Sequence, residues 1–168
     1  LPAIYPNYLT APEPQRRRYS SRFFVLLGLI IVCLIPRALI SLRISSICPD
    51  GVLYIHLAEA LQEGDFQQAF QEMKLNVYPV VLMSLNRLGL DWQAGGILWG
   101  LLVSSLVVLP LYGFARRQFD DTVALVSCFL YAVHPVFIQW SPELIRDSTF
   151  WLLFTLSLYF QWRAVTEV

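Results

Sequence analysis

The sequence predicts an all-α membrane protein, and three features lead to this fold class. Apolar residues make up 57% of the 168 and charged residues 14%, with a mean hydropathy of +0.56. A soluble domain normally carries about a quarter charged residues. Several apolar runs are long enough to cross a bilayer, and five Trp with eight Tyr supply side chains suited to its interfaces. We therefore expect membrane lipids around the chain.

Four runs are apolar over about 20 residues, the length that a helix needs to cross the hydrocarbon. We expect spans at about 23–42, 92–115, 122–139 and 147–162. Pro36 and Arg37 lie near the far end of the first, where a kink and a snorkelling guanidinium are tolerated. The stretch 76–90 is left out because it is short, opens on Tyr78 and Pro79, and contains Asn86 and Arg87.

Positively charged residues set the expected orientation. Those beside the spans are Arg16, Arg17, Arg18, Arg22, Arg116, Arg117 and Arg163. Four spans place all of them on one face, which the positive-inside rule makes cytoplasmic, whereas five spans would divide them. Eight of the twelve acids then lie outside. We expect an integral protein of a bacterial plasma membrane, with its N-terminus in the cytoplasm.

The chain divides into a disordered cytosolic tail at 1–21, rich in Pro and Arg, and a membrane domain at 22–168. We read the chain as the N-terminal part of a larger protein, inactive by itself. Its outer loop, 43–91, contains two expected amphipathic helices lying in the interface. The first has an apolar face of Leu53, Leu57, Ala60 and Leu61 and ends at Gly64; the second follows an Asp65 N-cap and has Phe66, Ala69, Phe70 and Met73.

Two function classes receive no support from the sequence. The formal net charge is zero, with no basic stripe or aromatic platform, so nucleic acid is not an expected partner. The three cysteines, Cys33, Cys48 and Cys128, form neither a disulfide framework nor a metal-binding spacing. We expect them to be small buried residues.

Two outer sites carry the candidate chemistry. Asp50 follows Pro49 where the chain enters the first outer helix, so it is either a helix N-cap or a reactive carboxylate. Glu143 and Asp147 are four residues apart, expected on one helical face, with Arg146 between them. The alternative role of these three is an ion pair closing the turn, although exposed pairs contribute only about 0 to 1 kcal/mol.

Carboxylates and an arginine at a membrane rim suit transfer of a group from a lipid-linked phosphate donor. One carboxylate would take the proton of an acceptor hydroxyl, and another would orient the site or hold a divalent ion, with Asp50 and Asp147 as the metal candidates. Arg146 would bind the departing phosphate. Tyr54 and His56 are further candidates for substrate contact, against interfacial anchoring for the tyrosine and a plain surface position for the histidine.

Two strings resemble the outer loops of GT-C superfamily glycosyltransferases. They are Asp50-Gly51-Val52-Leu53-Tyr54 with Val77-Tyr78-Pro79, and His134-Pro135 with Ser141, Glu143, Arg146 and Asp147. The nearest group includes the dolichyl-phosphate-mannose protein mannosyltransferases, the lipid A aminoarabinose transferases and the rhizobial lipopolysaccharide transferases. The resemblance implies a catalytic Asp50, a second acidic role for Asp147 or Glu143, a polyprenyl-phosphate sugar donor, and inversion at the anomeric carbon. Many members have a double acid where this chain has Asp50-Gly51.

Two other functions remain open. In a transporter or flippase segment the same acids would bind ions or substrate, but transporters usually place charges near the midplane on broken helices. In a non-catalytic scaffold the outer helices would bind a partner. The acceptor, whether glycan, lipid or protein, is not specified by the sequence.

Overall fold

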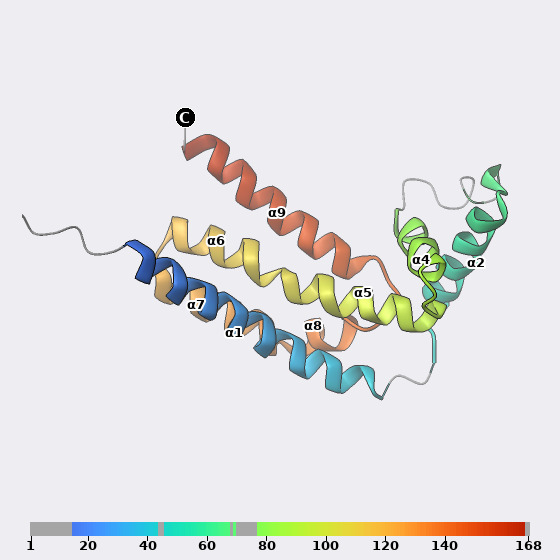
Figure 1. Ribbon diagram of the computed structural model, residues 1–168, viewed down its shortest axis with the longest axis horizontal. Coiled ribbons are helices and arrows are strands. Elements are labelled where there is room, and N and C mark those ends of the chain that lie inside the picture. The colour runs from blue at the N-terminus through green and yellow to red at the C-terminus, as the bar shows by residue number, and fades with distance from the viewer. Residues whose placement is uncertain (1–14, 44–45, 68, 70–76, 167–168) are drawn as a thin grey trace, which may run out of the picture.

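The computed structural model describes residues 15–43, 46–67, 69 and 77–166, with side chains from residue 23 onward. Helices are the only regular structure in this part of the chain (Figure 1). They are α1 Gln15–Ser41, α2 Pro49–Glu63, α4 Tyr78–Arg87, α5 Trp92–Leu106, α6 Val108–Gln118, α7 Asp121–Val133, α8 Pro135–Trp140 and α9 Asp147–Thr166. The all-α prediction is therefore confirmed.

The first helix begins earlier than expected. Residues 15–21, assigned from the sequence to a disordered tail, form the first turns of α1. Gln and Arg are good helix formers, and here they run without a break into an apolar helix that can propagate through them. The rest of the expected tail, residues 1–14, lies outside the described residues.

Two stretches are long and apolar enough to cross a membrane, Phe23–Ser41 and Trp92–Gln118. The second is interrupted at Val107, between α5 and α6. Pro110 explains the break, because it has no N–H to offer the Leu106 carbonyl four residues earlier. Asp121–Val133 is apolar but shorter. The number of four spans stays a prediction.

The third expected span, 122–139, is not one helix. The helix α7 ends at Val133, and α8 starts at Pro135. A proline disfavours helical geometry at the residue before it, and His134 has extended backbone angles, φ −66° and ψ 121°. The fourth begins at Asp147 as predicted and continues to Thr166.

The long helices pack side by side in a bundle, with α1 against α5, α6, α7 and α8, and α9 against α5 and α6 (Figure 1). Small and aromatic residues fill the centre, which includes Cys33, Val108, Ala124, Cys128 and Tyr131. Burial of Cys33 and Cys128 agrees with their expected role. The start of α1, the end of α6 and the end of α9 lie at the same end of the bundle (Figure 1). The arginine-rich segments therefore share one end.

The opposite end carries α2 and α4, which pack against each other (Figure 1). With ten residues at a rise of about 1.5 Å each, α4 is too short to span a bilayer, in keeping with its exclusion from the spans. Gly64 ends α2 with φ +86°, as expected. The buried face of α2 differs in part from the prediction, because Tyr54 and Ala58 join Leu57 and Leu61 whereas Leu53 is 42% exposed.

Only the start of the second expected outer helix falls within the described residues. Residues 66, 67 and 69 are helical, and the Ala69 N–H donates to the Asp65 carbonyl at 3.2 Å. Ala69 is buried, but Phe66 is 59% exposed and does not belong to a buried face. Phe70 and Met73 lie outside the described residues.

Candidate active site

The turn that joins α8 to α9, residues 141–146, is held between two glycine-bearing helices. A Cβ at Gly51 of α2 would lie 2.8 Å from Leu144 Cβ, and one at Gly96 of α5 would lie 2.7 Å from Leu144 Cγ. At Gly100, a Cβ would overlap the Ser141 carbonyl oxygen. All three contacts are closer than a Cβ atom tolerates, so only glycine lets the two helices approach this turn. The turn therefore packs against the start of α2, so the segment that contains Asp50 lies beside the segment that contains Glu143.

The charges at this turn have no side-chain partners among the residues that the structure describes. Glu143 and Asp147 are half-buried and Arg146 is exposed. In the described part of the chain, no ion pair or side-chain hydrogen bond joins these three residues to each other or to a neighbour. The ion-pair alternative is therefore wrong, and the charges remain available to a ligand.

Glu143 and Asp147 do not share a helical face, contrary to the prediction. The helix α9 begins at Asp147, and Glu143 lies in the irregular turn directly after Pro142. The backbone there is tight, since the Ile145 N–H donates to the Glu143 carbonyl at 2.8 Å. The cause is local, because the turn folds around the buried Leu144 side chain rather than following a helical path.

Asp50 lies at the start of α2, but it is not the helix N-cap. Cys48 occupies the cap position with an extended backbone, Pro49 follows, and Asp50 is in the first turn with no capping bond from a side chain. The capping interpretation is therefore wrong. A carboxylate in a first turn is still favoured by the positive end of the helix dipole. The exposed Asp50 side chain keeps its oxygens free for other contacts.

The Cys48 thiol lies close to both acidic segments. Burial raises the pKa of this thiol, and the Glu143 and Asp50 carboxylates raise the pKa further, against a lowering by the Gly51 backbone N–H. Two carboxylates act on one sulfur only if both are near it. The close packing of Gly51 against Leu144 independently places the two acidic segments next to each other. Asp50 and Glu143 thus converge on one place.

Asp147 and Arg146 line a cavity of about 430 Å³ between α4 and α9. Its apolar walls are Val77, Val81, Phe150 and Leu153. The first turn of α9 is fixed by a hydrogen bond from the Trp99 indole N–H to the Thr149 hydroxyl at 2.9 Å, and Thr149 also lines the cavity. The cavity therefore has a charged end and an apolar remainder.

Tyr54 and His56 have separate surroundings. Tyr54 is buried, with its ring edge-on to that of Tyr78 at a centroid distance of 5.4 Å. Tyr78 lines the cavity, so Tyr54 supports the cavity wall from behind. His56 is exposed, and its Nδ1 lies 3.4 Å from a carboxylate oxygen of Glu59 on the same helix. The structure does not bring His56 to the candidate acids.

A metal site built by the protein alone does not fit these residues. Among the described residues, no three His, Cys, Asp or Glu side chains gather as ion ligands. Divalent ions such as Mg²⁺ take about six oxygen ligands. A divalent ion at Asp50 and Asp147 would thus need further oxygen ligands beyond these two carboxylates.

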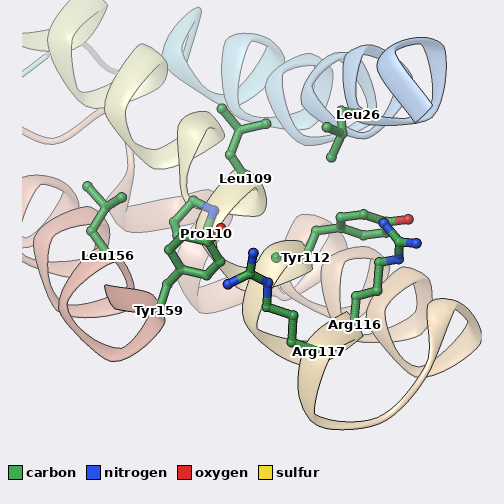
Figure 2. Close-up of a pocket in the computed structure, with 9 residues that line it drawn as sticks. Leu26, Leu109, Pro110, Tyr112, Arg116, Arg117, Leu156 and Tyr159 are labelled. Carbon is green, nitrogen blue, oxygen red and sulfur yellow. The ribbon is translucent and has the colours of Figure 1, made fainter. Parts of the chain in front are cut away.

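A second cavity, of about 650 Å³, lies at the arginine-rich end of the bundle, between α1, α6 and α9 (Figure 2). Its lining includes the apolar side chains of Leu26, Leu109 and Leu156 and the cations of Arg116 and Arg117. The Arg117 guanidinium is 5.1 Å from the centre of the Tyr159 ring. This cavity is a weaker candidate for an anionic substrate because its cations already have partners.

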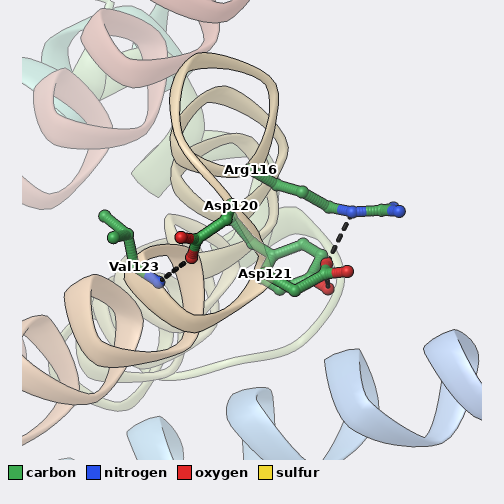
Figure 3. A network of polar contacts seen from close by, with 5 residues as sticks. Arg116, Asp120, Asp121 and Val123 are labelled. Carbon is green, nitrogen blue, oxygen red and sulfur yellow. Dashed lines mark hydrogen bonds and ion pairs between the residues drawn. The ribbon is translucent and has the colours of Figure 1, made fainter.

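The partner of Arg116 belongs to the connection between α6 and α7. Arg116 Nε lies 2.6 Å from the Asp121 carboxylate, which also accepts a bond from the Tyr112 hydroxyl at 2.9 Å (Figure 3). Asp120 caps α7 by accepting from the Val123 N–H at 2.8 Å (Figure 3). These charges therefore serve the local turn.

Arg37 differs more than any other predicted residue from its expected position. Instead of snorkelling, its side chain is fully buried and bonded to Ser141 and to backbone carbonyls of α7. The sequence signal for this burial was a charged residue inside an apolar run, with no acidic residue near it in the sequence. The Gly96 and Gly100 spacing, four residues apart on one helix, similarly signalled close packing.

These features define a class, a helical integral membrane protein with unpaired charges and an apolar cavity at one end. Residues 78–168, more than half of the chain, match the model of the dolichyl-phosphate-mannose-protein mannosyltransferase family. The chain belongs to this family, which confirms the GT-C resemblance and indicates glycosyltransferase activity. No curated protein and no solved structure matches the chain. The matched region contains Glu143, Arg146 and Asp147 but not Asp50.

Proposed function

We propose that this chain forms part of the site at which a glycosyltransferase moves a sugar from a polyprenyl-phosphate donor to an acceptor hydroxyl. The observation that carries the proposal is the cavity between α4 and α9, with Arg146 and Asp147 at its charged end and apolar walls elsewhere. A lipid-linked phosphate likewise has a charged phosphate at one end and an apolar hydrocarbon chain. Membership of the mannosyltransferase family supports this donor class.

Each charged residue has a role in the proposed reaction. Arg146 binds the donor phosphate through charge-assisted hydrogen bonds, for which its unpaired guanidinium is available. The acceptor oxygen attacks the anomeric carbon as the bond from that carbon to the phosphate oxygen breaks, with inversion. Asp50 takes the acceptor proton, and the polyprenyl phosphate leaves with the bonding electrons. Glu143 and Asp147 orient the acceptor and the sugar.

The proposed site faces the outside of the membrane, as the positive-inside rule places the arginine-rich end in the cytoplasm. We propose that this chain supplies one part of the site and needs the full-length protein for activity. We propose that the protein is located in the plasma membrane of a bacterium.

The proposal is tested by sugar transfer from a radiolabelled polyprenyl-phosphate sugar in the full-length protein. Asp50→Asn should lower kcat by about 100-fold or more, the usual contribution of a positioned base. Asp147→Asn should lower kcat by about 100-fold because the reacting groups lose their orientation. Arg146→Met should raise KM for the donor, and Arg146→Lys should restore part of the affinity because it keeps the charge.

The matched control is Glu63→Gln, which neutralises an exposed acid at the other end of α2 and should retain wild-type transfer. Membrane insertion of all variants is checked by their extraction and elution in detergent. Full transfer by both Asp50→Asn and Asp147→Asn would contradict the proposal and favour a scaffold.

A further inference from the structure

Arg37 is a fully buried cation in an apolar bundle, and in the described part of the chain it forms no ion pair. Burying a charge is costly unless it is hydrogen-bonded, and such residues inside membrane proteins are commonly functional. The Arg37 guanidinium offsets this cost by donating hydrogen bonds to oxygen atoms from three segments of the chain. Its guanidinium also lies 5.0 Å from the centre of the Tyr131 ring.

One group of bonds goes to the end of α7. The Arg37 Nη1 donates to the Ala132 carbonyl at 3.0 Å, and Nη2 donates to the Tyr131 carbonyl at 3.4 Å. Nη1 also donates to the Cys33 carbonyl of its own helix, α1, at 2.8 Å. The Tyr131 carbonyl would ordinarily accept from the N–H of residue 135, but this is Pro135, which has none. Arg37 therefore supplies donors that the helix break removes.

The remaining bond goes to the turn that carries the candidate acids. The Arg37 Nε donates to the Ser141 hydroxyl at 3.0 Å, and that hydroxyl donates to the Phe137 carbonyl of α8. Ser141 is fully buried, and its carbonyl oxygen rests on Gly100. One planar guanidinium thus joins α1, the end of α7 and the first residue of the turn.

We propose that Arg37 is a positioning residue, which holds the 141–146 turn and so places Glu143 and Asp147 for sugar transfer. It lines neither the cavity between α4 and α9 nor the cavity between α1, α6 and α9, so we assign it no contact with substrate. Its effect on the reaction rests on the proposed function, whereas its effect on the turn does not.

The test compares Ser141→Ala, Arg37→Lys and the double variant in the full-length protein. Ser141→Ala removes the bond from Arg37 to the turn, together with the bond from the hydroxyl to the Phe137 carbonyl, and leaves the bonds from Arg37 to the other carbonyls in place. Arg37→Lys loses the planar fork that reaches the serine and the carbonyls together. Each should lower kcat about 10- to 100-fold with little change in KM for the donor, because displaced catalytic groups cost rate more than binding. The double variant should lose no more than the worse single variant, as expected for one shared interaction.

Hydrogen–deuterium exchange of the peptide covering the turn gives a readout without substrate. Both single variants should exchange faster there, with α2 unchanged. The control is Ser104→Ala, a fully buried serine whose hydroxyl bonds only to the Leu101 carbonyl of its own helix. It should leave the turn and kcat unaltered.

Unchanged exchange in the turn, or losses of kcat that add in the double variant, would overturn the positioning role. If the exchange changes as expected but wild-type protein transfers no sugar, then the proposed function fails and the structural role of Arg37 stands.

Discussion

At the scale of single residues, Cys48 reports on the convergence of the two outer acidic segments. Its thiol precedes Asp50 by two residues in sequence, yet the Glu143 carboxylate, 95 residues away, also acts on it. The thiolate, not the thiol, reacts with alkylating agents. The alkylation rate of Cys48 therefore measures its pKa and, through it, the nearness of both carboxylates.

We predict that Cys48 is alkylated more slowly than an ordinary free cysteine at mildly alkaline pH, with a midpoint shifted to higher pH. The reason is that burial, Glu143 and Asp50 all raise its pKa and so reduce the thiolate fraction. Glu143→Gln and Asp50→Asn should each shift the midpoint down and speed labelling. The measurement is peptide-resolved mass spectrometry after timed iodoacetamide treatment.

Burial remains in both variants, so part of the upward pKa shift should persist. Glu63→Gln serves as the control, since Glu63 is not among the groups that act on Cys48. An unchanged midpoint in Glu143→Gln would mean that the turn does not approach the start of α2.

At the scale of the elements, prolines and glycines shape the candidate site. Pro135 ends α7 and Pro142 precedes Glu143, so the chain after α7 cannot form one straight helix. Gly96 and Gly100 then leave room on α5 for the resulting turn. The break after α7 and the small residues on α5 together produce an outer turn in which Leu144 is buried and the charged side chains are available to a ligand.

Gly100→Ala should destabilise the protein by about 1 to 3 kcal/mol, the usual cost of overpacking. The added Cβ overlaps the Ser141 backbone oxygen, which cannot rotate away as a side chain would. The matched control is Gly28→Ala in α1, where a Cβ meets nothing within 4 Å. Alanine should be neutral there or stabilise the helix by up to about 1 kcal/mol.

Thermal unfolding in detergent distinguishes these variants. A lower midpoint for Gly100→Ala together with an unchanged or higher midpoint for Gly28→Ala is expected. Equal midpoints for the two variants would show that the turn does not rest on α5 as closely as the structure indicates.

At the scale of the whole molecule, the bundle has two unlike ends. One contains the arginine-rich ends of α1, α6 and α9, and the other contains α2, α4 and the turn with Glu143, Arg146 and Asp147 (Figure 1). Arg116 and Arg117 are occupied by local partners, whereas Arg146 is not. The chemistry is therefore expected at the α2 end.

The orientation is tested with single cysteines in a Cys48→Ser background of the full-length protein. Gln62→Cys on α2 and Gln118→Cys at the end of α6 both replace exposed side chains. A membrane-impermeant maleimide applied to intact cells should label position 62 only, and position 118 should react after permeabilisation. Labelling of position 118 from outside would refute the four-span threading.

Local sequence signals were sufficient for the helical class and for the approximate starts of α2, α5, α7 and α9. They also named Asp50, Glu143, Arg146 and Asp147 as candidate residues, which stay a prediction. These signals are hydrophobic run length, Gly64 as a helix end, and charges beside apolar runs, all of which act within a few residues. They failed for features that depend on contacts between residues far apart in the sequence. The expected common helical face of Glu143 and Asp147 and the expected Asp50 cap are both absent.

Sequence alone determined that this chain is a helical membrane protein of the glycosyltransferase type, because burial of apolar runs and a family pattern are properties of the chain itself. Only the tertiary structure decided that Arg37 is buried and bonded to Ser141, and that Leu144 packs against Gly51. Each of these contacts joins residues more than 90 positions apart. Their existence depends on how separate helices pack, which no local pattern of residues specifies.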